Sequence, residues 1–258
     1  MPTFAADIGN SDTMLGLLEG DRVLAHWRVS TDEHRTADEW DVLVRGLLDR
    51  VSPAPRITGV AVCSTVPSVV HEWREALDLR FPGLPRVFVE PGTRTGVPVL
   101  TDNPREVGAD RVCNAVAAAA RWGGPAIIVD FGTAITFDVL NARGQYVGGA
   151  IAPGMEISLE SLGRRAAQLR QVELHRPRTV IARNTVEAVQ SGMVFGFASL
   201  VEGMVERMVA QLDVPAESVE VVSTGHLAPL VAQECACFTA HVPLLTLQGL
   251  GLVFDRNT

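Results

Sequence analysis

One short pattern occurs twice in this chain and constrains the fold more than any other feature. The segments FAADIGNSDTMLGLLEG (residues 4–20) and IIVDFGTAITFDVLNARG (residues 127–144) match at a constant offset of 123 residues. In each copy the pattern follows an apolar run and precedes a second apolar run and a glycine turn. The matched pairs are Asp7 and Asp130, Gly9 and Gly132, and Thr13 and Thr136. This correspondence predicts an internal duplication of one mixed α/β unit.

Each copy of the pattern has the composition of a phosphate-binding turn. A glycine allows the backbone to approach a ligand closely, and successive backbone N–H groups can line an anion-binding concavity. A carboxylate beside them would repel phosphate unless a divalent cation stands between the two, so a pair of such hairpins suits a nucleotide with Mg²⁺. A single Asp-x-Gly is equally typical of an ordinary tight turn. Two copies at equivalent places favour the phosphate-binding interpretation.

The charged residues narrow the chemistry further. All 22 basic residues are arginine, and the chain contains no lysine. The absence of lysine excludes a Walker P-loop, a protein-kinase lysine and Schiff-base chemistry. The net charge of -8 argues against a general nucleic-acid or anionic-membrane surface.

Hydrophobic periodicity predicts an alternation of strands and helices around the two hairpins. Thr36 and Glu39 have the spacing of a capping box at the start of a helix. The predicted strands are 3–8, 14–18, 22–29, 57–63, 86–89, 126–129, 146–150 and 219–223, with one more following the second hairpin. The predicted helices are 36–51, 64–79, 107–121, 156–169, 185–212 and 227–234.

The four cysteines, Cys63, Cys113, Cys235 and Cys237, lack the spacing of a disulfide framework. Cys235 and Cys237 could form part of a metal site, but no second pair accompanies them, and plain buried cysteines are the simpler interpretation. We find no uninterrupted apolar run of roughly 20 residues and no signal-peptide pattern. We therefore expect a cytoplasmic protein without a membrane segment.

The double Asp-x-Gly hairpin is similar to the actin/hexokinase/Hsp70 phosphotransferase fold. That resemblance implies an α/β fold with two duplicated ribonuclease-H-like halves, each with a mixed sheet flanked by helices. We place the N-terminal half at residues 1–113 and the C-terminal half at residues 114–258.

Several further segments resemble one family, the type III pantothenate kinases, over nearly the whole chain. They are HWRVSTDEHRTADEW (26–40), GVPVL (96–100), DNPREVGADRVCN (102–114), VDFGTAITFD (129–138), GGAIAPGM (148–155), RNTVEAVQSG (183–192) and STGHLA (223–228). The resemblance implies ATP-dependent phosphorylation of pantothenate to 4'-phosphopantothenate, the first step of coenzyme A biosynthesis. It also implies Mg²⁺, a monovalent cation (K⁺ or NH₄⁺), and a homodimer with pantothenate bound near the subunit interface.

The resemblance also implies roles for particular residues. Asp110 would accept the proton of the pantothenate hydroxyl, and Asp130 would hold the monovalent cation. Asp7 would reach Mg²⁺ through phosphate or water. The predicted ATP and phosphate contacts are Asp7, Ile8, Gly9, Asn10, Ser11, Asp12, Thr13, Gly132 and Thr133. The predicted pantothenate contacts are Gly108, Ala109, Asp110, Arg111 and Thr185.

The residues themselves leave simpler roles open. Asp110 could merely stabilise the first turn of a helix, Arg111 could be a surface arginine, and Asp130 could cap local N–H groups of a turn. Asp12 could face the nucleotide or only shape its turn. Helix 185–212 could pack against a partner subunit or be buried within the monomer.

Two positions depart from the family pattern. Thr101 stands where the family usually has a tyrosine that contacts pantothenate, and His226 stands where it has a glycine near the nucleotide. These departures keep two alternatives open: a non-catalytic regulatory protein that retains the fold, and a kinase of the same fold for another small alcohol. The three aspartates Asp7, Asp110 and Asp130 argue for an enzyme.

Overall fold

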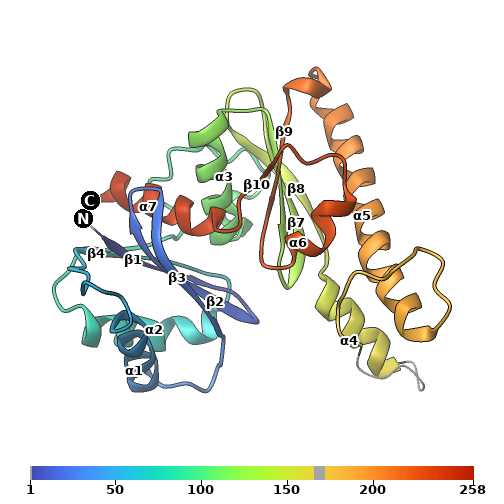
Figure 1. Ribbon diagram of the computed structural model, residues 1–258. Coiled ribbons are helices and arrows are strands. Elements are labelled where there is room, and N and C mark those ends of the chain that lie inside the picture. Colours follow the sequence, from blue (N-terminus) through green and yellow to red (C-terminus); the bar gives the residue numbers. More distant parts are fainter. Residues whose placement is uncertain (1, 166–171) are drawn as a thin grey trace. The chain divides into compact units, whose positions relative to one another are not determined.

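The computed structural model describes residues 2–165 and 172–258 (Figure 1). The chain divides into two compact units. The first contains the N-terminal residues up to Ala120 together with Leu244–Thr258, and the second contains Arg121–Pro243. Each unit contains one five-stranded sheet, and each is described by itself below.

The sheet of the first unit begins with the predicted antiparallel meander. Its strand order is β3-β2-β1-β4-β5, in which β4 and β5 run parallel to β1. The strands are β1 (Thr3–Ile8), β2 (Asp12–Glu19), β3 (Arg22–Ser30), β4 (Gly59–Ser64) and β5 (Arg86–Phe88). In the β1–β4 ladder Asp7 lies directly beside Cys63.

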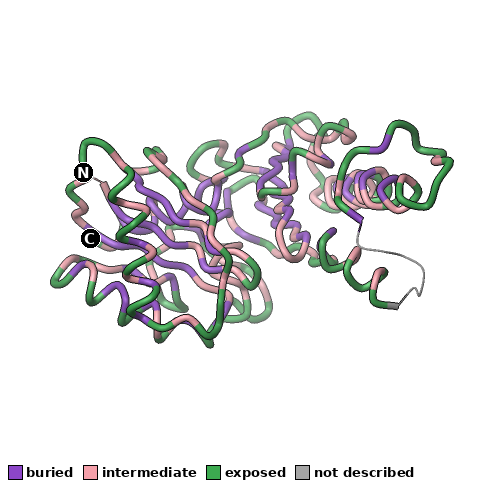
Figure 2. The backbone as a smooth tube through the Cα atoms, turned by 60° about the horizontal axis from the view of Figure 1, so that its bottom comes forward, coloured by how far each residue is buried: buried purple, intermediate pink, exposed green. Residues whose placement is uncertain are grey.

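One face of this sheet packs against two helices, α1 (Ala37–Leu48) and α2 (Pro67–Arg80). The rings of Trp40 and Trp73 meet there at a centroid distance of 4.5 Å, and both side chains are completely buried. The predicted capping box is confirmed, because Thr36 and Glu39 exchange side-chain and backbone hydrogen bonds at the start of α1. Figure 2 shows the buried strands at the centre of this unit.

The opposite face of the sheet is covered by α7 (Leu245–Asn257), a helix that the sequence analysis did not predict. Leu247 of this helix lies against Gly16, where an added Cβ would come within 3.0 Å of its side chain. Two further helices lie in the preceding segment: η1 (Pro104–Glu106), a short 3₁₀ turn, and α3 (Ala109–Trp122).

The division into units differs from the predicted halves in two places. The predicted boundary between residues 113 and 114 falls within α3, and the C-terminal helix belongs to the first unit. The physical reason is the packing of α7 on α3: an added Cβ at Gly249 would lie 2.0 Å from the backbone oxygen of Cys113. Thr246 also donates a buried hydrogen bond to Asn114 at 2.9 Å.

The sheet of the second unit repeats the topology of the first. Its order is β8-β7-β6-β9-β10, with antiparallel pairing through β6-β7-β8 and parallel pairing of β9 with β6 and of β10 with β9. The strands are β6 (Ala126–Phe131), β7 (Ala134–Leu140), β8 (Tyr146–Pro153), β9 (Glu220–Thr224) and β10 (Ala240–His241). The equivalent strand orders confirm the duplicated, ribonuclease-H-like fold.

The helices of the second unit are dominated by α5 (Thr185–Leu212), which has the predicted bounds. Its apolar stripe packs against the core of this unit, where Val201 and Val205 are buried. The other helices are α4 (Met155–Arg165), α6 (Ala228–Val231), η2 (Ala216–Ser218) and η3 (Ala232–Glu234). The predicted helix 156–169 matches α4 as far as residue 165, and residues 166–169 lie outside the described residues.

By length and composition alone, α5 could cross a membrane, although the sequence shows no uninterrupted apolar run of that length. The helix has 28 residues, and its most apolar window has a mean hydropathy of 1.3. A core helix of a globular protein meets the same criteria, and α5 contributes to the core of the second unit.

Candidate active site

The first hairpin closes tightly at Gly9. The Gly9 N–H donates to the carbonyl oxygen of Asp12 at 3.0 Å, and a Cβ at position 9 would lie only 2.9 Å from that oxygen. The next two residues, Asn10 and Ser11, are exposed at the tip of the turn. The turn therefore needs glycine at its first position and presents small polar groups to solvent.

Two threonine hydroxyls stabilise this turn from inside. Thr31 follows β3 and donates its side-chain hydroxyl to the carbonyl of Gly9 at 2.7 Å. Its hydroxyl also lies 2.9 Å from that of Thr13, and its N–H donates to the carbonyl of Ser11 at 2.9 Å. Thr13 is completely buried, so its hydroxyl serves the turn. The sequence analysis did not single out Thr31, although it lies within the segment 26–40 that resembles the family.

Asp12 begins β2 and forms an ion pair with Arg28 of β3, with 2.8 Å between Oδ2 and the guanidinium. Its carbonyl oxygen is the acceptor that closes the turn. Of the two roles open from the sequence, these contacts favour shaping the turn.

Asp7 is the penultimate residue of β1, and its carboxylate is half-buried. The thiol of Cys63 donates to its Oδ1 atom at a Sγ–Oδ1 distance of 3.2 Å. A carboxylate at the end of a strand, beside a turn with exposed polar groups, has the arrangement expected for contact with a cation-bound phosphate.

Asp110 occupies the first turn of α3, as predicted. Its Oδ1 atom is buried and accepts no hydrogen bond from the residues that the structure describes. Burial raises the pKa of the Asp110 carboxyl above its ordinary value, although the backbone N–H and the charge of Arg111 act in the opposite direction. A desolvated carboxylate with an unpaired oxygen and a raised pKa is typical of a catalytic base.

The residues around Asp110 leave space for its carboxylate. A Cβ at Gly108 would lie 2.5 Å from Asp110 Oδ1, so glycine is required there for this rotamer. Ala109 begins the helix, and both Ala109 and Arg111 are half-buried. In the segment before α3, the hydroxyl of Thr101 is likewise buried and has no hydrogen-bond partner among the described residues. These polar atoms lack partners within the described protein, as expected for groups that a ligand would satisfy.

The second hairpin is closed mainly by its backbone. The Gly132 N–H donates to the carbonyl of Ala134 at 3.1 Å, and the Gly154 N–H donates to the carbonyl of Thr133 at 3.1 Å. A Cβ at Gly154 would lie 2.2 Å from the carbonyl oxygen of Thr133. The start of α4 is therefore held directly against the second turn.

Two oxygen atoms converge at the end of β6. Gly225, with φ of +90°, follows β9 directly beside Asp130. A Cβ at Gly225 would lie 2.6 Å from both Asp130 Oδ1 and the carbonyl oxygen of Phe131. Carboxylate and carbonyl oxygens are the donors that hard cations prefer, so this glycine-lined position fits the predicted monovalent cation.

The sequence analysis did not identify one buried carboxylate, which lies in β7 two residues after Thr136. Asp138 of β7 is completely buried and accepts hydrogen bonds from Tyr146 at 2.8 Å and Thr136 at 3.3 Å. Thr136 pairs with Asp130 across the β6–β7 ladder. Asp138 therefore orients the threonine that belongs to the repeated pattern.

The remaining predicted positions in the second unit lie at the ends of elements. Thr185 is exposed at the start of α5, where the Asn184 side chain caps the helix. His226 is exposed, and its Nε2 atom lies 3.7 Å from a carboxylate oxygen of Glu156.

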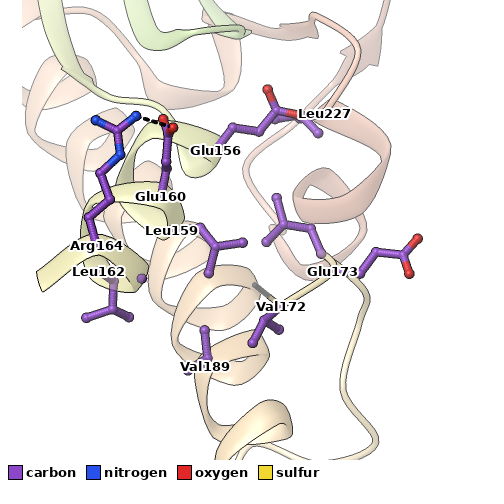
Figure 3. A pocket seen from close by; sticks show the side chains of 11 residues that line it. Glu156, Leu159, Glu160, Leu162, Arg164, Val172, Glu173, Val189 and Leu227 are labelled. Atoms are coloured by element: carbon purple, nitrogen blue, oxygen red, sulfur yellow. Dashed lines mark hydrogen bonds and ion pairs between the residues drawn. The ribbon is translucent and has the colours of Figure 1, made fainter. Parts of the chain in front are cut away.

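A cavity of about 700 Å³ lies beside α4 in the second unit (Figure 3). Its walls include Leu159, Val189 and Leu227, and the carboxylates Glu156 and Glu173 lie at its margin. None of the predicted site residues lines it, and carboxylates disfavour phosphate. The cavity therefore has no assigned part in phosphate binding.

Among residues 2–165 and 172–258, no cluster of three or more His, Cys, Asp or Glu side chains is placed to hold a metal. Cys235 and Cys237 are free thiols, as are the two other cysteines. Mg²⁺ at Asp7 would accordingly depend on phosphate and water for most of its ligands.

The duplicated sheets and their two glycine hairpins define the fold as that of the actin and hexokinase class of phosphotransferases. An inorganic polyphosphate/ATP-glucomannokinase from Arthrobacter sp. strain KM has the same fold, with a TM-score of 0.51 and 17% identity over 99% of this chain and 97% of that one. A Campylobacter jejuni protein thought to be a Baf-family transcriptional activator gives a TM-score of 0.60 and 16% identity, with 98% of each chain covered.

The sequence comparisons are more specific. The pattern of the type III pantothenate kinase family matches residues 3–207. A type III pantothenate kinase from Nocardioides sp. (strain ATCC BAA-499 / JS614) is 65% identical over 258 residues, covering 100% of both chains. Another from Streptomyces coelicolor is 54% identical, covering 97% of both. The chain belongs to the type III pantothenate kinase family.

Proposed function

We propose that this chain is an ATP-dependent pantothenate kinase that produces 4'-phosphopantothenate and ADP, in the first step of coenzyme A biosynthesis. The observation that carries the proposal is the state of Asp110. Its carboxylate is desolvated, its Oδ1 atom is unpaired, and Gly108 leaves room beside it. Membership in the family names the acceptor alcohol.

In the proposed reaction Asp110 accepts the proton of the pantothenate primary hydroxyl. The hydroxyl oxygen forms a bond to the γ-phosphorus of ATP, while the bond from that phosphorus to the β,γ-bridging oxygen breaks and ADP leaves. A raised pKa suits Asp110 to this role, because a more basic carboxylate takes up the proton more readily. Gly108, Ala109, Arg111 and Thr185 are the proposed pantothenate contacts.

The two hairpins would hold the ATP phosphates. In the first, the exposed Asn10 and Ser11 offer neutral donors, and Ile8 and Gly9 would bring the backbone close to the nucleotide. In the second, Gly132 and Thr133 do the same. Because the chain has no lysine, phosphate charge must be offset by arginine and by cations. Mg²⁺ would be held at Asp7 through phosphate and water, and K⁺ or NH₄⁺ would be held by Asp130 and the carbonyl of Phe131.

We also propose that the protein is a homodimer. The apolar stripe of α5 packs inside the second unit and is therefore not available to a partner subunit. The proposed contact surface is instead the N-terminal end of α5 together with the segment before it. Val180, Ile181 and Val186 are 63%, 87% and 51% exposed there. Adjacent apolar side chains that are exposed in a single subunit are typical of a surface that a partner covers. Light scattering should give a dimer mass, and Ile181→Asp should shift it toward the monomer.

The decisive experiment is a coupled ADP-release assay with pantothenate, with and without K⁺. We expect turnover that depends on pantothenate and falls by about 10²–10⁴-fold in Asp110→Asn. Arg105→Gln, an exposed position in η1 before α3, serves as a control. Turnover that is absent over a wide pantothenate range, with ATP still bound, would favour a regulatory protein. Turnover with a different alcohol would identify another substrate.

The same assay has an expected pH dependence. Because the pKa of Asp110 is raised by burial, kcat/KM should fall on the acidic side at a pH above that expected for an ordinary aspartate. The stability of the fold should change with pH in the opposite direction to the activity, because ionised Asp110 favours the reaction but disfavours the fold. Ionising a carboxyl with a raised pKa disfavours the fold once the pH exceeds its unfolded pKa, so Asp110→Asn should raise the Tm at neutral pH more than at pH 3.5.

A further inference from the structure

A buried thiol lies beside Asp7, one of the two carboxylates of the first unit that the proposed reaction uses. Cys63 belongs to β4 and is 1% exposed. It pairs with Asp7 in the parallel β1–β4 ladder, so the two side chains share one face of the sheet. The Cys63 thiol donates to Asp7 Oδ1 at 3.2 Å, within the range of a sulfur hydrogen bond.

The second link joins this thiol to the helix that carries Asp110. Cys113 is completely buried one turn after Asp110 on α3, and its thiol interacts with that of Cys63. The charge of Asp110 also acts on Cys63. The two thiols therefore connect the strand end at Asp7 with the first turns of α3.

The surroundings of Cys63 keep its thiol protonated. Burial raises the pKa of Cys63 well above its ordinary value, and the Cys113 thiol and the Asp7 carboxylate act in the same direction. A protonated thiol is a hydrogen-bond donor, which is the role it has toward Asp7. It is not poised as a nucleophile, because the thiolate is the reactive form.

We propose that Cys63 is a positioning residue, whose thiol holds the Asp7 carboxylate in the orientation needed for cation-bound ATP. The proposal rests on the proposed kinase function, because that function assigns Asp7 to the nucleotide. Cys63 itself touches neither substrate nor phosphate. Its effect passes through the Sγ–Oδ1 hydrogen bond.

The test compares Cys63→Ala, which removes the donor, with Cys63→Ser, which keeps an O–H donor of similar size. For Cys63→Ala we expect a KM for MgATP about 3- to 10-fold higher, the loss typical of one neutral hydrogen bond, with the KM for pantothenate unchanged. Cys63→Ser should remain within about twofold of the wild type.

Val62→Ala is the matched control for packing. Val62 is also completely buried in β4, but its side chain belongs to the core that faces α1 and α2, on the other side of the sheet from Asp7. This variant should lower the Tm and leave the KM for MgATP unchanged. If Val62→Ala raises that KM as much as Cys63→Ala, or if Cys63→Ser fails to rescue it, the effect is general strand packing and the inference is wrong.

Calorimetric titration with MgADP and with MgATP separates this inference from the proposed function. If the wild type binds nucleotide but does not phosphorylate pantothenate, the proposed function fails, and the Cys63 variants are still judged by their affinity. Weaker MgATP binding in Cys63→Ala, restored in Cys63→Ser, would support the inference. Equal binding by all three proteins would overturn it, whatever the activity.

Discussion

In the first hairpin side-chain hydroxyls reinforce the backbone hydrogen bonds that close the turn, whereas in the second two further backbone segments pack against the turn. Thr31 and Thr13 tie the first turn together through their hydroxyls, and the Cys63 thiol holds the adjacent carboxylate. The second turn is closed by the N–H of Gly154 and covered by Gly225. One repeated sequence pattern thus acquired two different kinds of support.

The difference follows from what surrounds each copy. The first hairpin is flanked by β3, whose end supplies a hydroxyl at Thr31. The second is approached by two backbone segments, at Gly154 and Gly225, where any side chain would collide with the turn. The first hairpin should therefore be sensitive to the loss of polar atoms, and the second to the gain of a single methyl group.

Gly225→Ala should have the largest effect on stability. The new Cβ would meet Asp130 Oδ1 and the Phe131 carbonyl at 2.6 Å, in a backbone conformation with φ of +90°. We expect a loss of about 2–4 kcal/mol in the free energy of unfolding, together with loss of K⁺ activation. Chemical denaturation and a K⁺ titration of activity measure the two effects.

Gly148→Ala is the matched control, because Gly148 also has a positive φ, of +128°, but has no atom within 4 Å of an added Cβ. It should cost only the conformational strain, about 1–2 kcal/mol, and leave K⁺ activation intact. Equal losses in the two variants would show that crowding at the second hairpin is unimportant.

Tyr146→Phe should come next. It removes the hydroxyl that donates to the completely buried Asp138 at 2.8 Å. A buried carboxylate that loses a donor costs about 1–3 kcal/mol in the free energy of unfolding. In an Asp138→Asn background the same change should cost less, and a double-mutant cycle by urea denaturation measures the difference. Strict additivity would mean that Asp138 does not depend on Tyr146.

Thr31→Val tests the side-chain support of the first hairpin. The variant keeps the shape of threonine but loses the hydrogen bonds to the Gly9 carbonyl and to Thr13. We expect a loss of about 1 kcal/mol in the free energy of unfolding and a higher KM for MgATP. Thr31→Ser should preserve both values. A KM that is unaffected by Thr31→Val would separate the rigidity of the turn from nucleotide binding.

The two hairpins and most of the sheet order could be predicted because a strand, an Asp-x-Gly turn and a second strand give a local signal twice. The helix α7 could not. Gly249 and Gly251 lie in its interior, and glycine disfavours a helix when no tertiary contact is considered. In the folded chain these glycines allow close contact with the carbonyls of Cys113 and Gly20.

The candidate active site also depends on contacts that could not be predicted from the sequence. The sequence identified Asp110 as a candidate base by family resemblance, but its unpaired Oδ1 atom arises from burial that only the folded chain provides. Cys63 lies 56 positions from Asp7 and meets it only through parallel strand pairing. Contacts of this kind leave no local pattern, so neither Cys63 nor the pair of Asp138 and Tyr146 was predicted.

Asp12→Asn should have the smallest effect on stability and on nucleotide binding. The variant tests whether Asp12 shapes the turn or faces the nucleotide. The ion pair with Arg28 is partly exposed, with side-chain exposures of 45% for Arg28 and 22% for Asp12. Such pairs contribute less than about 1 kcal/mol. The Asp12 carbonyl, which closes the turn, is retained in the variant. We therefore expect the stability and the KM for MgATP to change little.

Arg28→Gln provides the comparison for this variant. If Asp12 acts only through the ion pair, then Asp12→Asn, Arg28→Gln and the double variant should have equal free energies of unfolding and equal KM values for MgATP. A KM that changes several-fold in Asp12→Asn but not in Arg28→Gln would place the Asp12 carboxylate at the nucleotide. The first hairpin would then place two acids at the phosphates, whereas the second places only Asp130 there. The two hairpins would differ in what they bind as well as in the contacts that support them.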